Sequence, residues 1–277
     1  MVAKIRETSV IDNNKLSQIL MNKNIKIIDA SWFLGDTKKG YKEYKKEHIP
    51  GAIFFDIEFF FKTRKNLPHM MPEERFFKNQ VEKMGIKNSD KIIIYDQIGF
   101  FSSCRVWFTF KTFGHKEVMI LDGGLKNWIK EKLKTTSIIP TSKQSIYKVK
   151  FDKKKIKNMS DVRNAIYKNE FLIVDARVED RFNEKVDEPR KHVSRGKIPN
   201  SFNIPFNKIF DCEGFLLKDR KLKELFKFEK SFFEKNTIVL CGSGITACNI
   251  IFALEILGKK SNYLYDGSWS EWGHIEI

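Results

Sequence analysis

Short apolar runs, mostly of β-branched residues, alternate along the chain with segments whose apolar positions recur every three or four residues. The short runs are typical of buried strands, and the periodic segments are typical of helices that cover a sheet. This alternation predicts an α/β fold with a mostly parallel sheet, in which ligands bind beyond the carboxyl ends of the strands. Strands are expected at residues 27–30, 92–96, 173–176 and 237–240, and helices at 75–84, 106–113, 161–168 and 249–257.

The pattern occurs twice, with corresponding segments in the same order and 144 to 149 positions apart. An internal repeat of this length indicates a duplicated domain. We therefore expect two tandem α/β domains, residues 1–135 and 155–277, joined by a Ser/Thr/Lys-rich linker at 136–154. The matching segments are residues 27–30 with 173–176, 48–53 with 197–202, 92–96 with 238–241, 121–124 with 265–268, and Trp128 with Trp272.

Length and charge limit the classes of partner. The chain has 277 residues, 42% of them hydrophobic, which suffices for two packed cores. Its net charge is +16, but the lysines are dispersed, so we expect attraction of small anions and no nucleic-acid partner. No apolar run approaches the roughly 18 residues of a membrane span, and Met1–Leu20 lacks a signal-peptide core, so no membrane partner is expected.

The cysteines and histidines indicate the compartment and exclude a metal centre. Four cysteines without a CxxC pair are too few for a disulfide scaffold, which favours a reducing, cytoplasmic location. Five scattered histidines fit no metal-ligand spacing, and no metal or other cofactor is expected.

One predicted strand, residues 237–240, ends on Cys241, and Gly242-Ser243-Gly244-Ile245-Thr246-Ala247 follows before the next helical pattern. A thiol in such a turn faces unpaired backbone N–H groups and the positive end of the helix dipole. Both favour the thiolate, which is the reactive form of cysteine. Cys241 is therefore the leading candidate for a nucleophile, whereas Cys248, on the following helix, is expected in the core.

Two other chemistries use loops of similar shape. A tyrosine-phosphatase loop needs an arginine six positions after its cysteine to clamp the phosphate, and Ala247 stands there. A dinucleotide-binding fingerprint fits the glycines, with Asp266 about 20 residues further on. The first repeat lacks such glycines, however, and the chain ends soon after Asp266.

The first repeat has Asp96 where the second has Cys241, and its loop continues Gln97-Ile98-Gly99-Phe100-Phe101. This copy lacks the nucleophile, and we expect it to lack the glycine-rich cradle as well. We infer one inactive and one catalytic copy, with the site in the cleft between them.

The loop Cys241–Ala247 within a twin repeat resembles the two-domain rhodanese superfamily. Its uncharged Gly242 and Ser243 are similar to the 3-mercaptopyruvate sulfurtransferase branch, because thiosulfate-using relatives carry a basic residue near the second loop position. Lys197 and Asn200 depart from the family's usual His and Gly at one turn, which concerns local structure. Further matching stretches are residues 48–52, 54–58, 68–72, 105–107, 113–115, 122–124, 187–190 and 265–269.

The resemblance implies roles for individual residues. Cys241 would be the nucleophile that forms a persulfide. Arg181 and Arg190 would bind the carboxylate of the substrate, because guanidinium groups offer a rigid fork of donors. The other loop residues expected to line the substrate site are Gly242, Gly244, Ile245 and Thr246.

The resemblance also implies a relay of Ser243, His69 and Glu58 that activates the substrate or the nucleophile. The implied reaction takes sulfur from 3-mercaptopyruvate, a small anion, and releases pyruvate. The sulfur then passes from the cysteine to cyanide or to a thiol such as thioredoxin or a small thiol. Two alternatives stay open: thiosulfate as the sulfur donor, and a non-catalytic rhodanese-like module that binds or relays sulfur.

Overall fold

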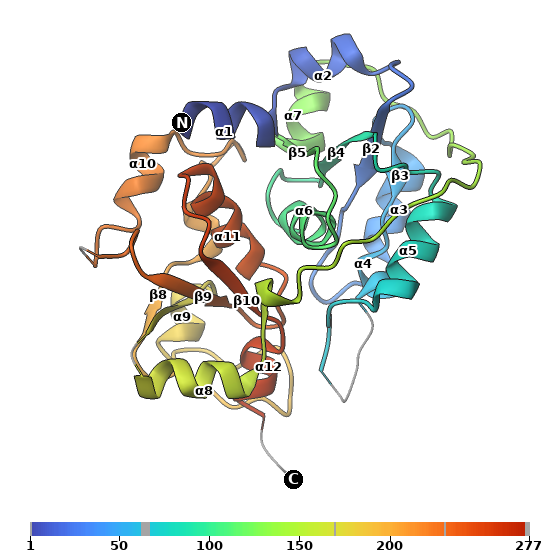
Figure 1. Cartoon of the computed structure of the whole chain (residues 1–277). Helices are drawn as coiled ribbons and strands as arrows, with labels where there is room; N and C mark the ends of the chain where they lie inside the picture. Colours follow the sequence, from blue (N-terminus) through green and yellow to red (C-terminus); the bar gives the residue numbers. More distant parts are fainter. Residues whose placement is uncertain (1, 62–66, 169, 230, 275–277) are drawn as a thin grey trace.

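Each half of the molecule is built around a five-stranded parallel sheet (Figure 1). The computed structural model describes residues 2–61, 67–168, 170–229 and 231–274. The first sheet has the order β1-β5-β4-β2-β3 and the second β6-β10-β9-β7-β8, so one topology is repeated, as the sequence repeat predicted. The strands are β1 Val10–Ile11, β2 Ile25–Asp29, β3 Ile53–Phe54, β4 Lys91–Tyr95, β5 Val118–Leu121, β6 Ile156–Lys157, β7 Phe171–Asp175, β8 Ser201–Asn203, β9 Asn236–Leu240 and β10 Asn262–Tyr265.

Helices connect and cover the strands in both halves. The four helices expected from the sequence correspond to α5, α6, α8 and α11, each starting one to three residues earlier than predicted. No helix within the described residues is long and apolar enough to cross a membrane. The helices are α1 Val2–Ser9, α2 Asn13–Ile19, α3 Lys39–Lys46, α4 Ile57–Phe60, α5 Glu74–Lys83, α6 Ser103–Thr112, α7 Gly124–Lys130, α8 Met159–Lys168, α9 Glu179–Phe182, α10 Asp219–Glu224, α11 Ala247–Ile256 and α12 Ser268–Trp272, with 3-10 turns η1 Lys153–Lys155 and η2 Phe206–Lys208.

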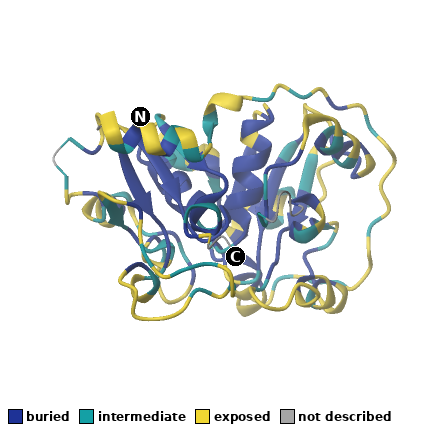
Figure 2. Cartoon of the chain, turned by 90° about the horizontal axis from the view of Figure 1, so that it is seen from below, coloured by how far each residue is buried: buried dark blue, intermediate teal, exposed yellow. Residues whose placement is uncertain are grey.

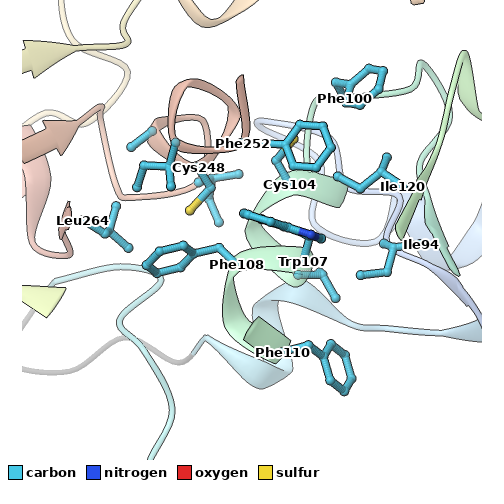
Figure 3. Packing of buried hydrophobic residues seen from close by; sticks show 14 of the residues in the cluster. Ile94, Phe100, Cys104, Trp107, Phe108, Phe110, Ile120, Cys248, Phe252 and Leu264 are labelled. Atoms are coloured by element: carbon cyan, nitrogen blue, oxygen red, sulfur yellow. The ribbon is translucent and has the colours of Figure 1, made fainter. Parts of the chain in front are cut away.

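Helices α6 and α11 pack against each other between the two sheets. Nine of the ten residues of each helix are buried. Helix α11 is almost wholly apolar, as expected of a buried helix, whereas α6 also buries polar side chains such as Arg105. Trp107 of α6 and Phe252 of α11 meet edge to face with ring centroids 4.9 Å apart (Figure 3). One hydrophobic cluster contains both Ile94 of β4 and Val239 of β9, so the two halves share a core, seen as the buried centre of Figure 2.

The expected linker, residues 136–154, is anchored along the first half rather than free. Tyr147 is fully buried, and its N–H donates to Glu82 Oε1 at 2.9 Å. The Tyr147 hydroxyl lies 3.0 Å from His115 Nδ1. Further along, the N–H of Lys150 donates to the carbonyl of Phe113 at 3.1 Å. These contacts hold the segment against α5 and the end of α6.

Candidate active site

Cys241 follows β9 directly, and its residue surface is only 2% exposed. Backbone hydrogen bonds from the start of α12 hold two carbonyls of the loop that begins at Cys241. The N–H of Trp269 donates to the Cys241 carbonyl, and the N–H of Ser270 donates to the Gly242 carbonyl, each at 2.9 Å. The shape of the loop around the sulfur is therefore fixed by the neighbouring helix.

A buried ion pair between the two halves also holds this loop. Arg105 of α6 is fully buried, and its Nη2 lies 2.8 Å from Asp266 Oδ1. The same guanidinium donates to the carbonyls of Gly244 at 3.1 Å and His69 at 2.8 Å, while Asp266 Oδ2 accepts from the N–H of Met71 at 2.7 Å. Gly244 has a φ of 80°, and a Cβ there would lie 3.1 Å from Arg105 Nη1, so glycine suits this position.

The corresponding loop of the first half shows where the N–H groups of such a turn point. The Asp96 carboxylate is buried and accepts four backbone hydrogen bonds. Gly99, with a φ of 113°, keeps the left-handed turn found at the third position after Cys241. The prediction that this copy lacks the cradle is therefore wrong, because a carboxylate fills it. The donors are the N–H groups of Ile98, Gly99, Ser102 and Ser103, at 2.7–3.0 Å.

Three predicted site residues, from separate segments of the chain, form a hydrogen-bonded row. His69 Nδ1 lies 2.8 Å from Ser243 Oγ, and His69 Nε2 lies 3.3 Å from Glu58 Oε1. The same Glu58 oxygen accepts from Trp32 Nε1 at 2.7 Å. Hydrogen bonding to His69 is the main reason that the pKa of Glu58 is lowered, with Trp32 adding to it and burial opposing it. Glu58 is therefore ionised at neutral pH.

Arg181, the first of the predicted substrate-binding arginines, is held by an acidic side chain. Glu188 bonds to both Arg177 and Arg181, at 2.7 Å between Arg177 Nη1 and Glu188 Oε1. Arg177 is also paired with the fully buried Asp175, with its Nη2 2.7 Å from Asp175 Oδ2. This network fixes the direction of the Arg181 guanidinium.

Arg190 and Arg181 both lie near the cysteine loop. A Cβ on Gly242 would lie 2.8 Å from Arg181 Nη2, so the guanidinium packs directly on the loop backbone. Burial is the main reason that the pKa of Arg190 is lowered; negative charge on the Cys241 sulfur opposes the shift, and Arg181 adds to it. Arginine stays charged at neutral pH, so the loop faces two cations.

These side chains meet in a cavity of about 220 Å³ between the two halves, in the expected cleft. Cys241, Ser243, Arg181 and Arg190 line it from the second half, and Trp32 lines it from the first. His69 and Glu58 connect to it through Ser243. Of the other predicted loop residues, Gly242, Ile245 and Thr246 line the cavity, and Gly244 lies behind it against Arg105.

The sequence patterns assigned no role to Arg105 or Glu188, and gave Asp266 a role only in the rival dinucleotide-binding fingerprint. A signal for Arg105 was present, because a charged residue inside an apolar helical pattern is almost never buried without a partner. The identity of that partner depends on how the halves pack, which no local pattern encodes. Within the described residues, no three His, Cys, Asp or Glu side chains gather as they would around a metal ion.

The fold and the cysteine loop define a class of protein that comparison with known families identifies. The rhodanese-like domain model matches residues 12–131 and again residues 158–274. The chain belongs to the rhodanese-like domain family, with two copies of the domain in tandem.

Individual relatives narrow this class. The chain is 35% identical to mouse 3-mercaptopyruvate sulfurtransferase over 90% of its length and 84% of the relative's. It is 34% identical to the Arabidopsis thaliana mitochondrial thiosulfate/3-mercaptopyruvate sulfurtransferase 1, over 95% of this chain and 75% of that protein. It is also 35% identical to thiosulfate sulfurtransferase of Cricetulus griseus, over 90% and 85%.

A solved structure agrees over the whole fold. The crystal structure of SseA from Escherichia coli, described as a 3-mercaptopyruvate sulfotransferase with the rhodanese fold, superposes with a TM-score of 0.86. The two sequences are 33% identical, and the match covers 95% of this chain and 99% of that one.

Proposed function

We propose that this protein is a sulfurtransferase that takes sulfur from 3-mercaptopyruvate through a persulfide on Cys241 and passes it to a thiol or to cyanide. One observation carries the proposal: Cys241, the Ser243–His69 hydrogen bond and two arginines converge on one small cavity. A nucleophile, a proton relay and a binding site for an anion are the parts that this reaction needs.

In the first step the Cys241 thiolate attacks the sulfur of the substrate. A sulfur–sulfur bond forms, the carbon–sulfur bond breaks, and pyruvate leaves as its enolate. Arg181 and Arg190 bind the carboxylate and the carbonyl oxygen. Because negative charge moves from one sulfur to the other, we assign the loop N–H groups to stabilising it, as preorganised donors do in anion holes.

The substrate thiol carries a proton that the enolate carbon must receive. We assign this transfer to the Ser243–His69–Glu58 row. Ionised Glu58 holds the proton of His69 on Nε2, so that Nδ1 faces the Ser243 hydroxyl as an acceptor. In the second step an acceptor thiolate attacks the outer sulfur, and Cys241 leaves as the thiolate.

Two arguments favour 3-mercaptopyruvate over thiosulfate as the donor. Relatives of similar identity carry both names, so the site itself must decide. The second and third loop positions, Gly242 and Ser243, carry no charge, whereas a thiosulfate dianion favours a cation there. Sulfite leaves thiosulfate without needing a proton, so a relay is useful only to the mercaptopyruvate reaction.

The test compares pyruvate release from 3-mercaptopyruvate with sulfite release from thiosulfate, for the native chain and for Cys241→Ser. We expect a higher kcat/KM with 3-mercaptopyruvate and no turnover by Cys241→Ser. Full activity in Cys241→Ser would refute the mechanism. A native chain that gains one sulfur atom by intact mass but never turns over would instead support the non-catalytic sulfur-relay alternative.

We also propose that thioredoxin or a small thiol is the sulfur acceptor. We further propose that the two domains span residues 1–135 and 155–277. All four cysteines are free, which supports a reducing compartment such as the cytoplasm.

A further inference from the structure

A second cavity, of about 450 Å³, adjoins the cysteine pocket. It lies in the first half beyond the carboxyl ends of β2 and β4, which are neighbours in the sheet (Figure 1). Trp32, Leu34 and Phe101 line both cavities. Trp32 and Phe101 stack with ring centroids 5.7 Å apart and form a shared aromatic wall.

The surface of this cavity is mostly apolar. The polar groups of its lining include those of Asp36, Lys39 and Gln97. The Asp96 carboxylate already uses four N–H groups of the loop, so the cavity offers no anion cradle of the kind proposed at Cys241. Phe33 and Ile98 add apolar surface, and Ile98 is 44% exposed. Lys39 is exposed, with its Nζ 4.5 Å above the Phe33 ring.

We propose that this second cavity is the acceptor subsite and binds the apolar body of a small thiol that collects sulfur from Cys241. The inference rests on the proposed function and adds the class of acceptor. The donor is a small anion, and the two arginines place it in the cysteine pocket. That leaves the adjoining cavity free for the second reactant.

Geometry links the two sites. The outer sulfur of a Cys241 persulfide occupies the cysteine pocket, whose wall toward the first half is Trp32, Leu34 and Phe101. An acceptor thiolate that reaches this sulfur from that wall leaves its body over the second cavity. Its sulfur bonds to the outer sulfur, the bond to Cys241 breaks, and the acceptor departs as a persulfide, with the thiol proton released to solvent.

The experiment measures the second step with a homologous series of acceptors: 2-mercaptoethanol, 4-mercapto-1-butanol and 6-mercapto-1-hexanol. Burying a methylene group favours binding by about three- to fourfold. We therefore expect kcat/KM for the acceptor to rise at least tenfold from the shortest to the longest thiol. Cyanide, which has no methylene groups to bury, serves as the reference acceptor.

Variants localise the effect. Phe33→Ala and Ile98→Ala should flatten the rise by about threefold or more, and Ile98→Trp, which fills the cavity, should abolish it. All three should leave the cyanide reaction and single-turnover pyruvate release unchanged. Ile129→Ala is the matched control, because Ile129 is 40% exposed on α7 and lines neither cavity.

The two proposals fail in different ways. Loss of the proposed function would appear as absent turnover with every acceptor. The acceptor subsite is overturned if the native enzyme turns over but shows the same kcat/KM along the series, as it would for a site that serves protein thiols. It is equally overturned if the rise persists in all three cavity variants.

Discussion

At the scale of single residues, His69 is the most constrained group in the site. Its φ is 59°, a left-handed conformation that is uncommon for any residue other than glycine. Arg105 holds its carbonyl, and Ser243 and Glu58 hold the two ring nitrogens. Strained backbone persists where surrounding contacts over-determine it, and such places cluster at functional sites. The strain here aims the imidazole between a hydroxyl and a carboxylate.

Ser243→Ala tests this relay. The variant loses the hydroxyl between His69 and the cavity but keeps Cys241, so we expect kcat with 3-mercaptopyruvate to fall by about a hundredfold, the usual size of an acid–base contribution. Turnover of thiosulfate, whose product needs no proton, should fall much less. Steady-state kinetics with both donors provide the measurement. Ser194→Ala, which removes a hydroxyl bonded to the Gly273 carbonyl, is the control; equal losses on both donors would argue against the relay.

At the scale of elements, the loops after β4 and β9 make the same backbone turn around different side chains. Both turn through a left-handed glycine, Gly99 three positions after Asp96 in one and Gly244 three positions after Cys241 in the other. One loop encloses a carboxylate, and the other presents a cysteine to the cavity. The first loop thus keeps its backbone around the Asp96 carboxylate, at the place where we propose that the second loop stabilises a transient negative charge.

Asp96→Ala should show how much the enclosed Asp96 carboxylate stabilises the first half. The change leaves three buried N–H groups, and the part-buried N–H of Ile98, without their acceptor. Each buried unsatisfied group costs about 1–3 kcal/mol. We expect the free energy of unfolding, measured by urea titration, to fall by roughly 3 kcal/mol or more, and by less in Asp96→Asn. Asp36→Ala, which removes an exposed carboxylate with backbone contacts, should cost under about 0.5 kcal/mol. Equal stability of Asp96→Ala and the native chain would show that the loop keeps its conformation without the Asp96 carboxylate.

These elements also show how much of the fold could be predicted from the sequence. Four strands and four helices could be predicted because each depends on local periodicity. The twin repeat could be predicted because corresponding segments recur in the same order. Asn200, with a φ of 60°, takes the turn that Gly51 makes with a φ of 79° in the first half. The contacts of Arg105 and Glu188 could not be predicted, because they join segments far apart in the chain.

At the scale of the whole molecule, the two halves act as one body. The hydrophobic cluster runs through both, and several polar contacts also join them. One is the hydrogen bond from the Leu216 N–H to Asp122 Oδ1, at 2.8 Å. Another is the pair of Arg6 and Asp219, whose side chains are 23% and 31% exposed. The buried pair of Arg105 and Asp266 lies at the active loop itself.

Asp122 lies at the boundary between the two halves and should make the free energy of unfolding depend on pH. Burial raises its pKa from 3.8 to about 6, while the bond from Leu216 opposes the rise. The folded protein therefore binds this proton more tightly than the unfolded chain, so the contribution of Asp122 to stability decreases as pH rises from about 4 to 6 and stays low above. Asp122→Asn keeps an acceptor oxygen without the charge. It should raise the free energy of unfolding by about 1–2 kcal/mol at pH 8, with the gain vanishing below pH 4.

Urea titrations of both chains at pH 4, 6 and 8 measure this difference. A gain that is the same at all three values would mean that the carboxylate is not the titrating group.

The Arg105–Asp266 pair should couple the joint between the halves to catalysis. Arg105→Lys keeps the charge, but a single ammonium cannot reproduce the fork that reaches Asp266 and the carbonyls of Gly244 and His69. We expect kcat with 3-mercaptopyruvate to fall about tenfold with little change in KM, because the arginines that bind the donor are untouched. Asp266→Asn should lower the free energy of unfolding by about 3 kcal/mol, since it leaves a buried cation without its partner.

Asp219→Asn is the matched control, because it breaks an ion pair between the halves that lies away from the loop. A partly exposed pair contributes about 1 kcal/mol or less, so both kcat and stability should stay near native values. If Asp219→Asn lowers kcat as much as Arg105→Lys does, then catalysis depends on the halves staying joined in general. If only Arg105→Lys lowers kcat, the joint acts through the carbonyls of His69 and Gly244, and the first half supplies the alignment of the proposed relay.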